Sequence, residues 1–404
     1  MSRHHTSARR LLRRKVLATG LAIGTFAAVL VPATGASAAG CGFLGLFPCA
    51  NSIASRVPGT PVTPVNQVNT YPDPVPNPKV GSVPNTAKIG KMDAGVVPVI
   101  GKVSAQADDG AYVLYEKQMD ARTVDLMISS PALGGAAAVR LMLPKDWSTS
   151  PTATWPSMYL LTGGHDATDY QTWSWNTHIE QYTANANALI VMPSVGAAGF
   201  VTNFWNYGLG SLGGYQYDTY LATELPQILQ RGYRAGSKAV VAGISSGGYS
   251  SVALAALHPG RFAVAASYSG LPDTQAGNTA ITIELMPLVM WQVPLAMWGD
   301  SIGQWYIWNA NNPAAHLSGL KGTKVIISSG NGTAGPLDPP GSSGDTLMEP
   351  IVLASSQGFV QKASAAGLDV TADFYGPGTH SWTYWEREWV RSWPSFAAGL
   401  GIPA

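Results

Sequence analysis

The chain has 404 residues, of which 46% are hydrophobic and only 12% are charged. This length and composition allow a sizeable core, so one large domain is expected. Without the basic residues of the first 38 positions, the remainder holds 18 basic and 23 acidic residues, a net charge of −5 that offers nothing to attract nucleic acid.

The first 38 residues are typical of a signal peptide. Five basic residues from Arg9 to Lys15 precede an apolar stretch from Val16 to Val31, and a small-residue cleavage site ends at Ala38. A membrane-spanning helix is the alternative, but the apolar run is short and broken by glycine. We therefore expect a secreted or cell-wall-associated protein without a transmembrane anchor.

Residues 39–95 are expected to form a cysteine loop and a proline-rich linker. Cys41 and Cys49 are the only two cysteines and favour a small disulfide, with lipid attachment at Cys41 as the alternative. Eight prolines fall between Pro58 and Pro84, where few large apolar groups are present to offset the entropy of ordering. A catalytic domain is then expected over 96–404.

From residue 110 onward, short apolar segments alternate with longer helical patterns. Continuous apolar strands that alternate with helices are typical of a buried, mostly parallel sheet with helices on both faces. The sequence therefore predicts an α/β fold. Candidate strands are 111–116, 123–130, 137–143, 157–163, 188–194, 238–243, 263–269, 324–329 and 370–375, and candidate helices are 218–233, 250–259 and 350–367.

Two adjacent serines stand between the predicted strand 238–243 and the helix that follows it. A nucleophile elbow needs this strand, turn and helix, with glycines at Gly243 and Gly247 to avoid clashes. We expect Ser245 to be a nucleophile and the backbone NH of Ser246 to face a developing oxyanion. The alternative is a tight loop whose serines cap the helix.

A serine hydroxyl becomes a good nucleophile only when a base takes its proton. His380 lies in a glycine-rich loop after the last predicted strand and follows Ser245 in the chain order of such hydrolases, so we expect it to be the base. A structural loop histidine is the alternative. The orienting acid should come between them, and position alone leaves Asp338, Asp345 and Glu349 open.

The turn after the predicted strand 157–163 is placed to complete the site. The backbone NH of Gly164 or of His165 would supply the second oxyanion donor, and the His165 side chain would line the substrate pocket.

From about residue 155 to 390 the chain resembles the secreted antigen 85 mycolyltransferases and the wider esterase family that contains them, all α/β-hydrolases. The likeness is carried by YLLTGGHDATDYQTWSWNT (159–177), LATELPQIL (221–229), GISSGG (243–248), HPGRF (258–262), GNGT (330–333) and GTHSWTYW (378–385).

The resemblance implies a role for each site residue. The family's serine falls on Ser245, its histidine on His380, and its glutamate, ten residues before a phenylalanine in the last long helix, on Glu349. The family's oxyanion donors correspond to the NH groups of Gly164 and Ser246.

The chain also departs from the mycolyltransferases. In the stretch LLTGGHD, Thr162 and His165 stand where those enzymes carry an aspartate that binds trehalose and an arginine, which weakens the expectation of a sugar acceptor. Thr162, His165 and Trp382 are expected to line the substrate pocket. The apolar stretch 281–308 is expected either to wall an acyl-chain site or to form a buried helix pair.

The sequence predicts a monomeric, exported carboxylic-ester hydrolase that acts on a lipid or other acyl ester. An acyltransferase that moves a fatty acyl chain to a sugar or lipid hydroxyl is the alternative. A silent wall- or glycan-binding protein that exposes Trp205, Trp382 and Trp385 is the alternative of another class. No cofactor or metal is expected, since the sequence has no H-E-x-x-H motif and no cysteine cluster.

Overall fold

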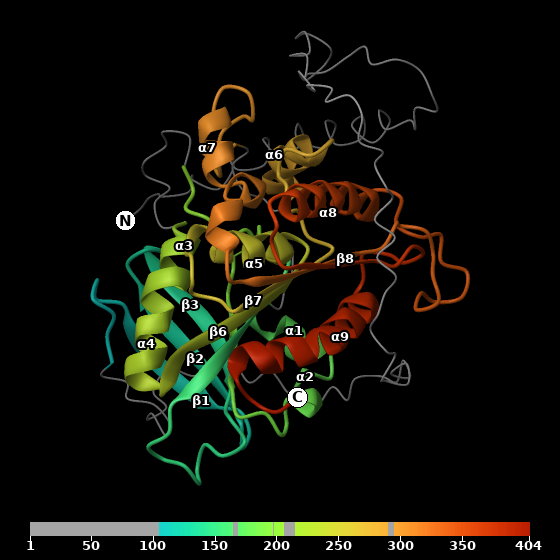
Figure 1. Cartoon of the computed structure of the whole chain (residues 1–404). Helices are drawn as coiled ribbons and strands as arrows, with labels where there is room; N and C mark the ends of the chain where they lie inside the picture. Colours follow the sequence, from blue (N-terminus) through green and yellow to red (C-terminus); the bar gives the residue numbers. More distant parts are fainter. Residues whose placement is uncertain (1–104, 165–168, 197, 206–214, 290–294) are drawn as a thin grey trace, which may run out of the picture. The chain divides into compact units, whose positions relative to one another are not determined.

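The computed structural model describes residues 105–164, 169–196, 198–205, 215–289 and 295–404 (Figure 1). The predicted signal peptide, the cysteine loop, the proline-rich linker and His165 lie outside the described residues. None of the helices in these ranges has the length and hydropathy to span a membrane.

A sheet of nine strands, in the order β1-β2-β3-β5-β4-β6-β7-β8-β9, runs through the described part of the chain. The pairs among β1, β2, β3 and β5 are antiparallel, and every pair from β5 across to β9 is parallel. The mostly parallel sheet predicted from the sequence is therefore confirmed. The strands are β1 (Tyr112–Gln118), β2 (Thr123–Ser130), β3 (Gly135–Met142), β4 (Trp155–Leu161), β5 (Leu189–Pro193), β6 (Ala235–Ile244), β7 (Val264–Tyr268), β8 (Lys324–Ser329) and β9 (Val370–Phe374).

Helices cover both faces of this sheet. Apolar residues of α4, α5 and α8 pack on one face, and those of α1, α2 and α9 pack on the other; Figure 1 shows α8 and α9 on opposite sides of β8. The inner strands β5 and β7 are buried along their whole length, as expected for continuous apolar runs between two helical layers. The helices are α1 (Thr172–Asn176), α2 (Ile179–Tyr182), α3 (Tyr217–Thr219), α4 (Leu225–Gly232), α5 (Ser246–Leu257), α6 (Thr279–Val289), α7 (Trp305–Ala310), α8 (Met348–Ala365) and α9 (Trp382–Leu400).

The last helix was not predicted from the sequence. The sequence predicts a glycine-rich loop around His380 and no helix after it, but α9 begins at Trp382. Aromatic residues have modest helix propensity and Pro394 interrupts the pattern, so local preference does not indicate a helix here. Burial of Trp385, Trp389 and Phe396 against the sheet stabilises it instead.

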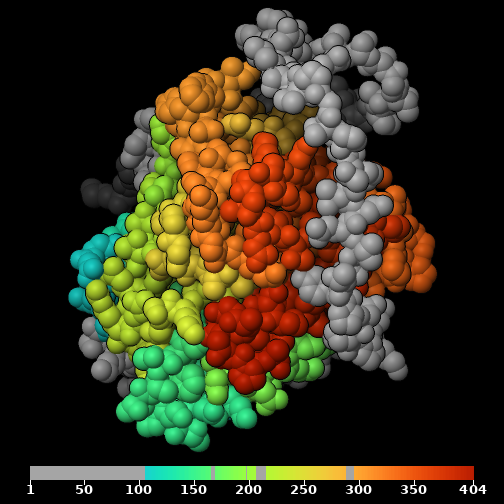
Figure 2. Space-filling view, viewed as in Figure 1, coloured from blue at the N-terminus to red at the C-terminus, as the bar shows by residue number. Residues whose placement is uncertain are grey.

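The stretch 281–308, for which the sequence left two interpretations open, packs only one side against the domain. Ile283, Met286, Trp298 and Trp308 are buried in a cluster with Tyr249 of α5. Other large apolar side chains of α6 and α7 are exposed, and the atoms of α7 lie at the surface in Figure 2. A fully buried helix pair is therefore the wrong interpretation.

Candidate active site

Ser245 occupies a sharp turn between β6 and α5. Its backbone has φ 53° and ψ −126°, a conformation that residues other than glycine seldom adopt. The Ser245 NH donates to the carbonyl of Tyr268 at 2.9 Å, and the NH of Gly248 donates to the Ser245 carbonyl at 2.9 Å. The turn is thus held both by the neighbouring strand and by the first turn of the helix.

Two glycines make this turn possible. A Cβ at Gly243 would lie 2.0 Å from the carbonyl oxygen of Gly247, and a Cβ at Gly247 would lie 2.2 Å from that of Thr162. Both distances are far below van der Waals contact. At these two glycines the backbones of β6, α5 and the turn after β4 lie too close together for any side chain to fit between them, as a nucleophile elbow requires.

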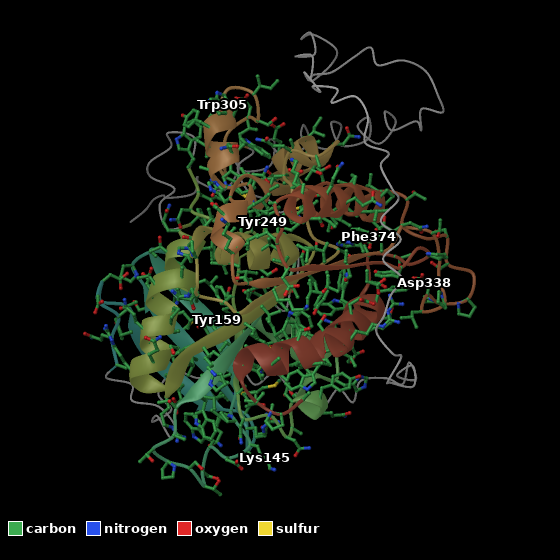
Figure 3. The ribbon with its side chains drawn as sticks, in the orientation of Figure 1. Lys145, Tyr159, Tyr249, Trp305, Asp338 and Phe374 are labelled. Carbon is green, nitrogen blue, oxygen red and sulfur yellow. The ribbon has the colours of Figure 1, made fainter. Side chains whose placement is uncertain are left out.

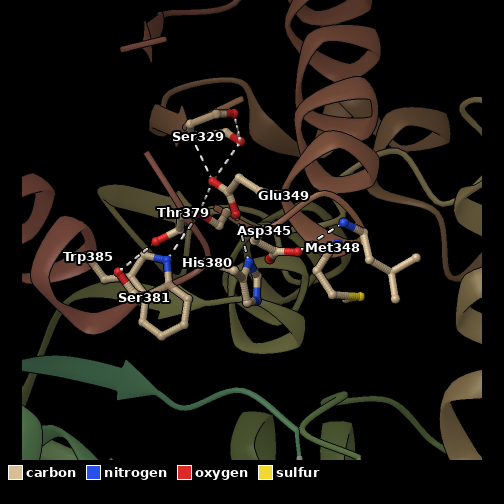
Figure 4. Close-up of polar contacts among 12 residues, drawn as sticks. Ser329, Asp345, Met348, Glu349, Thr379, His380, Ser381 and Trp385 are labelled. Carbon is tan, nitrogen blue, oxygen red and sulfur yellow. Dashed lines mark hydrogen bonds and ion pairs between the residues drawn. The ribbon is translucent and has the colours of Figure 1, made fainter. Parts of the chain in front are cut away.

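His380 and Glu349 form a hydrogen-bonded pair at the same edge of the sheet (Figure 4). The Nδ1 atom of His380 lies 2.8 Å from Oε2 of Glu349. Glu349 is fully buried in the first turn of α8, whereas the His380 side chain keeps 15% of its surface exposed just before α9. A buried carboxylate in this position fixes the orientation of the ring and leaves Nε2 for a reaction partner.

The other oxygen of Glu349 is saturated with donors. Oε1 accepts hydrogen bonds from Ser269 Oγ at 2.8 Å, Ser329 Oγ at 3.2 Å and the NH of Gly330 at 2.7 Å. These residues directly follow or end β7 and β8. Because the carboxyl ends of parallel strands meet at one edge, the sheet itself supplies the donors that make a buried carboxylate tolerable.

The two competing carboxylates have other partners. Asp345 accepts hydrogen bonds from the NH groups of Leu347 and Met348, at the start of α8. Asp338 accepts from the hydroxyl of Tyr384 at 2.8 Å. The structure therefore brings Glu349, and neither aspartate, to His380.

Trp385 packs behind the histidine. Its ring meets that of His380 edge to face at 4.9 Å, and its Nε1 donates to Ser269 Oγ at 3.0 Å. Trp385 is only 6% exposed, so the expectation that it is exposed on a binding surface is wrong. Its side chain is buried between α9 and the sheet, although its neighbours in the sequence are polar. Sequence reasoning also missed Ser269, whose only signal was its place at the end of a predicted strand.

The turn after β4 lies directly against the serine. A Cβ at Gly163 would be 3.0 Å from the Cβ of Ser245 and 3.5 Å from its Oγ. A Cβ at Gly199 would be 2.3 Å from Ser246 Oγ and 2.6 Å from the Gly164 nitrogen, so these two atoms are close neighbours. Gly199, at φ 68°, lies against the Gly164 nitrogen, one of the expected oxyanion donors, and against the side chain of Ser246. No local sequence pattern identified it.

The remaining residues predicted for the site, Ser245, Thr162 and Trp382, are not part of the hydrogen-bonded pair of His380 and Glu349. Among the residues that the structure describes, no hydrogen bond links the Ser245 hydroxyl to His380. Thr162 is buried directly after β4. Trp382 is partly exposed and packs edge-on against Trp173 and Trp385, with ring centroids 5.3 Å and 5.2 Å away.

A shallow cavity lies at the opposite end of the strands. It is lined by Ser157 and Tyr159 of β4, by residues at the start of β6 and by Arg261. Since Ser245 follows the last residue of β6, this cavity is remote from the hydroxyl, and it has no part in the candidate active site.

Comparison with known proteins identifies the family of the chain. A family model described as a putative esterase matches residues 130–395. Over 254 residues the chain is 32% identical to a diacylglycerol acyltransferase/mycolyltransferase Ag85B of Mycobacterium intracellulare, which covers 61% of this chain and 76% of that protein. It is 29% identical to the Ag85A protein of the same description from Mycobacterium leprae, over 68% of this chain and 83% of the relative.

A solved structure shows the same likeness. The crystal structure of Mycobacterium tuberculosis MPT51 (FbpC1) matches with a TM-score of 0.57 and 25% identity, and the match covers 68% of this chain and 97% of that one. A ferulic acid esterase with 19% identity shares the fold, with a TM-score of 0.51.

Proposed function

The chain belongs to the putative esterase family, whose members hydrolyse esters or transfer acyl groups, and on that premise we propose that it is a serine carboxylic-ester hydrolase with a Ser245–Glu349–His380 triad. One observation supports this most strongly. The strained turn at Ser245 and the His380–Glu349 pair occupy the same edge of the sheet.

In the proposed first half-reaction, Ser245 Oγ attacks the ester carbonyl carbon while His380 Nε2 takes the hydroxyl proton. Glu349 stabilises the resulting imidazolium through Nδ1. The backbone NH groups of Gly164 and Ser246 would donate to the oxyanion of the tetrahedral intermediate. When the intermediate collapses, the protonated His380 gives its proton to the departing alkoxide, which leaves as an alcohol.

The second half-reaction decides between hydrolysis and transfer. Water attacks the acyl-Ser245 ester while His380 takes a proton from it. When this second tetrahedral intermediate collapses, His380 returns the proton to Ser245 Oγ, which regenerates the serine and releases a carboxylic acid. If an alcohol attacks instead, the acyl chain is transferred. Transfer is the second candidate because both relatives above are named diacylglycerol acyltransferase/mycolyltransferase.

A p-nitrophenyl ester assay on the wild type and on Ser245→Ala tests the proposal. We expect release of p-nitrophenol by the wild type and almost none by the variant. Equal rates would favour the silent wall- or glycan-binding alternative. Product analysis with trehalose or glycerol present then separates an acylated acceptor from a free acid.

We also propose that the protein is exported, that residues 1–38 are removed on the way, and that residues 96–404 form a monomeric catalytic domain. Amino-terminal sequencing of the secreted chain would test the cleavage site. A chain truncated to begin at residue 96 should retain esterase activity and sediment as a monomer.

A further inference from the structure

Five large apolar side chains of α6, α7 and the turn before α7 face solvent. Ile302 is 72% exposed, Trp305 62% and Tyr306 55%, and Ile281 and Leu285 are about half exposed; we call these five residues the outer apolar face. Figure 3 shows Trp305 at the outermost part of this region. Isolated apolar residues at a surface are common, but a group such as this one marks an interaction site.

The outer apolar face is held together by the turn before α7. The carboxylate of Glu284, on α6, accepts a hydrogen bond from the NH of Ser301 at 2.5 Å, which joins α6 to that turn. The rings of Trp305 and Tyr306 pack edge to face, with centroids 6.4 Å apart. The exposed residues of both helices therefore belong to one surface.

These helices are apolar on both sides. Ile283 and Met286 of α6 are buried against the domain, while Ile281 and Leu285 of the same helix are exposed. A surface helix normally turns a polar face outward, and one that is apolar all round is normally buried. The outer apolar face thus has the composition of a surface that becomes covered.

The backbone of the exposed turn already has its hydrogen bonds. Asp300 Oδ1 accepts from the NH groups of Ile302 and Gly303, at 3.2 Å and 2.6 Å. Gln304 Oε1 accepts from the NH of Asp300 at 3.0 Å. Burying an unpaired backbone group in an apolar medium is costly, and these contacts remove that cost at the tip.

Charge indicates the kind of surface. No Lys or Arg occurs between Arg261 and Lys321, and the acids nearest the tip, Glu284 and Asp300, are engaged by the backbone. Residues 262–320, to which the outer apolar face belongs, therefore supply no lysine or arginine to bind anionic headgroups. Tryptophan and tyrosine suit the boundary between acyl chains and water, because their rings are apolar and carry one polar atom.

The same helices contact the helix that begins at the serine turn. Tyr249, in the first turn of α5, packs against Trp298 at 5.5 Å and donates its hydroxyl to the carbonyl of Asn311, just after α7, at 2.7 Å. The segment that carries the outer apolar face is thus packed against the first turn of α5, four residues from Ser245.

We propose that the outer apolar face docks the enzyme onto an uncharged or zwitterionic acyl-lipid surface, from which the ester is drawn to Ser245. Delivery of the ester to Ser245 rests on the proposed function, whereas docking onto the lipid surface needs no catalysis. Docking and catalysis can therefore fail separately.

The test is co-sedimentation with phosphatidylcholine vesicles, in the Ser245→Ala background so that no lipid is consumed. The variant Ile302→Ser/Trp305→Ser should bind these vesicles at least about tenfold more weakly, because it removes two of the most exposed apolar groups. The matched control is Leu114→Ser, which removes an exposed leucine from the edge strand β1 and should bind like its parent. Both variants should keep the circular dichroism and melting temperature of the parent.

The lipid proposal fails if the double variant and its parent bind phosphatidylcholine equally, or if phosphatidylglycerol vesicles bind the parent more tightly. It also fails if the parent is a dimer that the double variant dissociates, since a second copy would then be the occupant. With Ser245 intact, the double variant should hydrolyse soluble p-nitrophenyl acetate at the wild-type rate but lose rate on an ester dispersed in phosphatidylcholine. Hydrolysis without vesicle binding would overturn docking alone, and binding without hydrolysis would overturn the proposed function alone.

Discussion

His380 Nδ1 and Glu349 Oε2 are 2.8 Å apart, although one residue precedes α9 and the other lies in the first turn of α8. The contact joins two helices that cover opposite faces of the sheet. The orientation of the imidazole therefore depends on the packing of both helical layers, and the predictions below test parts of that arrangement.

Replacement of Glu349 by glutamine should lower kcat for a p-nitrophenyl ester by about 10³ to 10⁴-fold, because a neutral amide neither fixes the productive tautomer nor stabilises the imidazolium. The control is Asp345→Asn, four residues earlier, which should retain most of the activity since Asp345 contacts the start of α8 rather than His380. A greater loss in Asp345→Asn than in Glu349→Gln would assign the acid to Asp345.

Ser245→Gly should be inactive but more stable than Ser245→Ala by about 1 kcal/mol, because glycine adopts the φ of 53° without steric cost. Urea unfolding of the two variants measures the difference. An alanine variant as stable as the glycine variant would show that the turn stores no strain.

Gly199→Ala should reduce kcat by about 10²-fold, since the new methyl group would displace the Gly164 nitrogen or the start of α5 and so disturb the oxyanion donors. Gly260→Ala is a matched control. Gly260 has φ 77°, close to the 68° of Gly199, but no atom lies within 4 Å of the added methyl group. Both variants should lose stability through backbone strain, and only Gly199→Ala should lose turnover; equal turnover in the two would contradict the placement of the donors.

Stability should depend on pH through Glu388. Burial raises the pKa of its carboxyl to about 7; Arg387 and Arg391 act to lower this pKa and Asp373 to raise it further. Because the pKa of Glu388 is higher in the folded than in the unfolded chain, the folded chain holds the proton more tightly, and this stabilises the fold. The stabilisation is complete below the unfolded pKa of about 4.5 and is lost as pH rises through about 7.

Glu388→Gln removes this titration. Its stability relative to the wild type should therefore increase between pH 5 and pH 8, by about 1 to 3 kcal/mol. Urea unfolding of both proteins at the two pH values measures the change. A difference that stays constant or shrinks as pH rises would show that the arginines already hold the carboxyl ionised.

Much of the fold is visible in the sequence because its strands are local apolar runs. Each segment predicted as a strand, such as 188–194 and 263–269, overlaps an observed strand, and the helix after Ser245 follows β6 as expected. The helix α9 was missed, since what stabilises it is the burial of Trp385 and Trp389 against a distant sheet.

The site was less accessible to sequence reasoning. Ser245 is set by a local strand, turn and helix, so its pattern identifies it as a candidate. The neighbour of His380 depends on how a long loop folds, and the order of residues alone left Asp338, Asp345 and Glu349 open. Gly199 and Ser269 enter the site only through long-range approach, for which the sequence carries no local signal.

The amide of Ser245 donates to the carbonyl of Tyr268, and the amide of Ser269 donates to that of Ser328, so the candidate active site continues the hydrogen-bond ladder between β6, β7 and β8. The segment between β7 and β8, which carries α6 and α7, continues from the ends of these two strands and packs on Tyr249 of α5. Exchange of that segment for one from a relative should therefore change which acyl chains are accepted and leave the reaction chemistry intact. A scaffold built in this way can acquire new substrates by recombination of one segment.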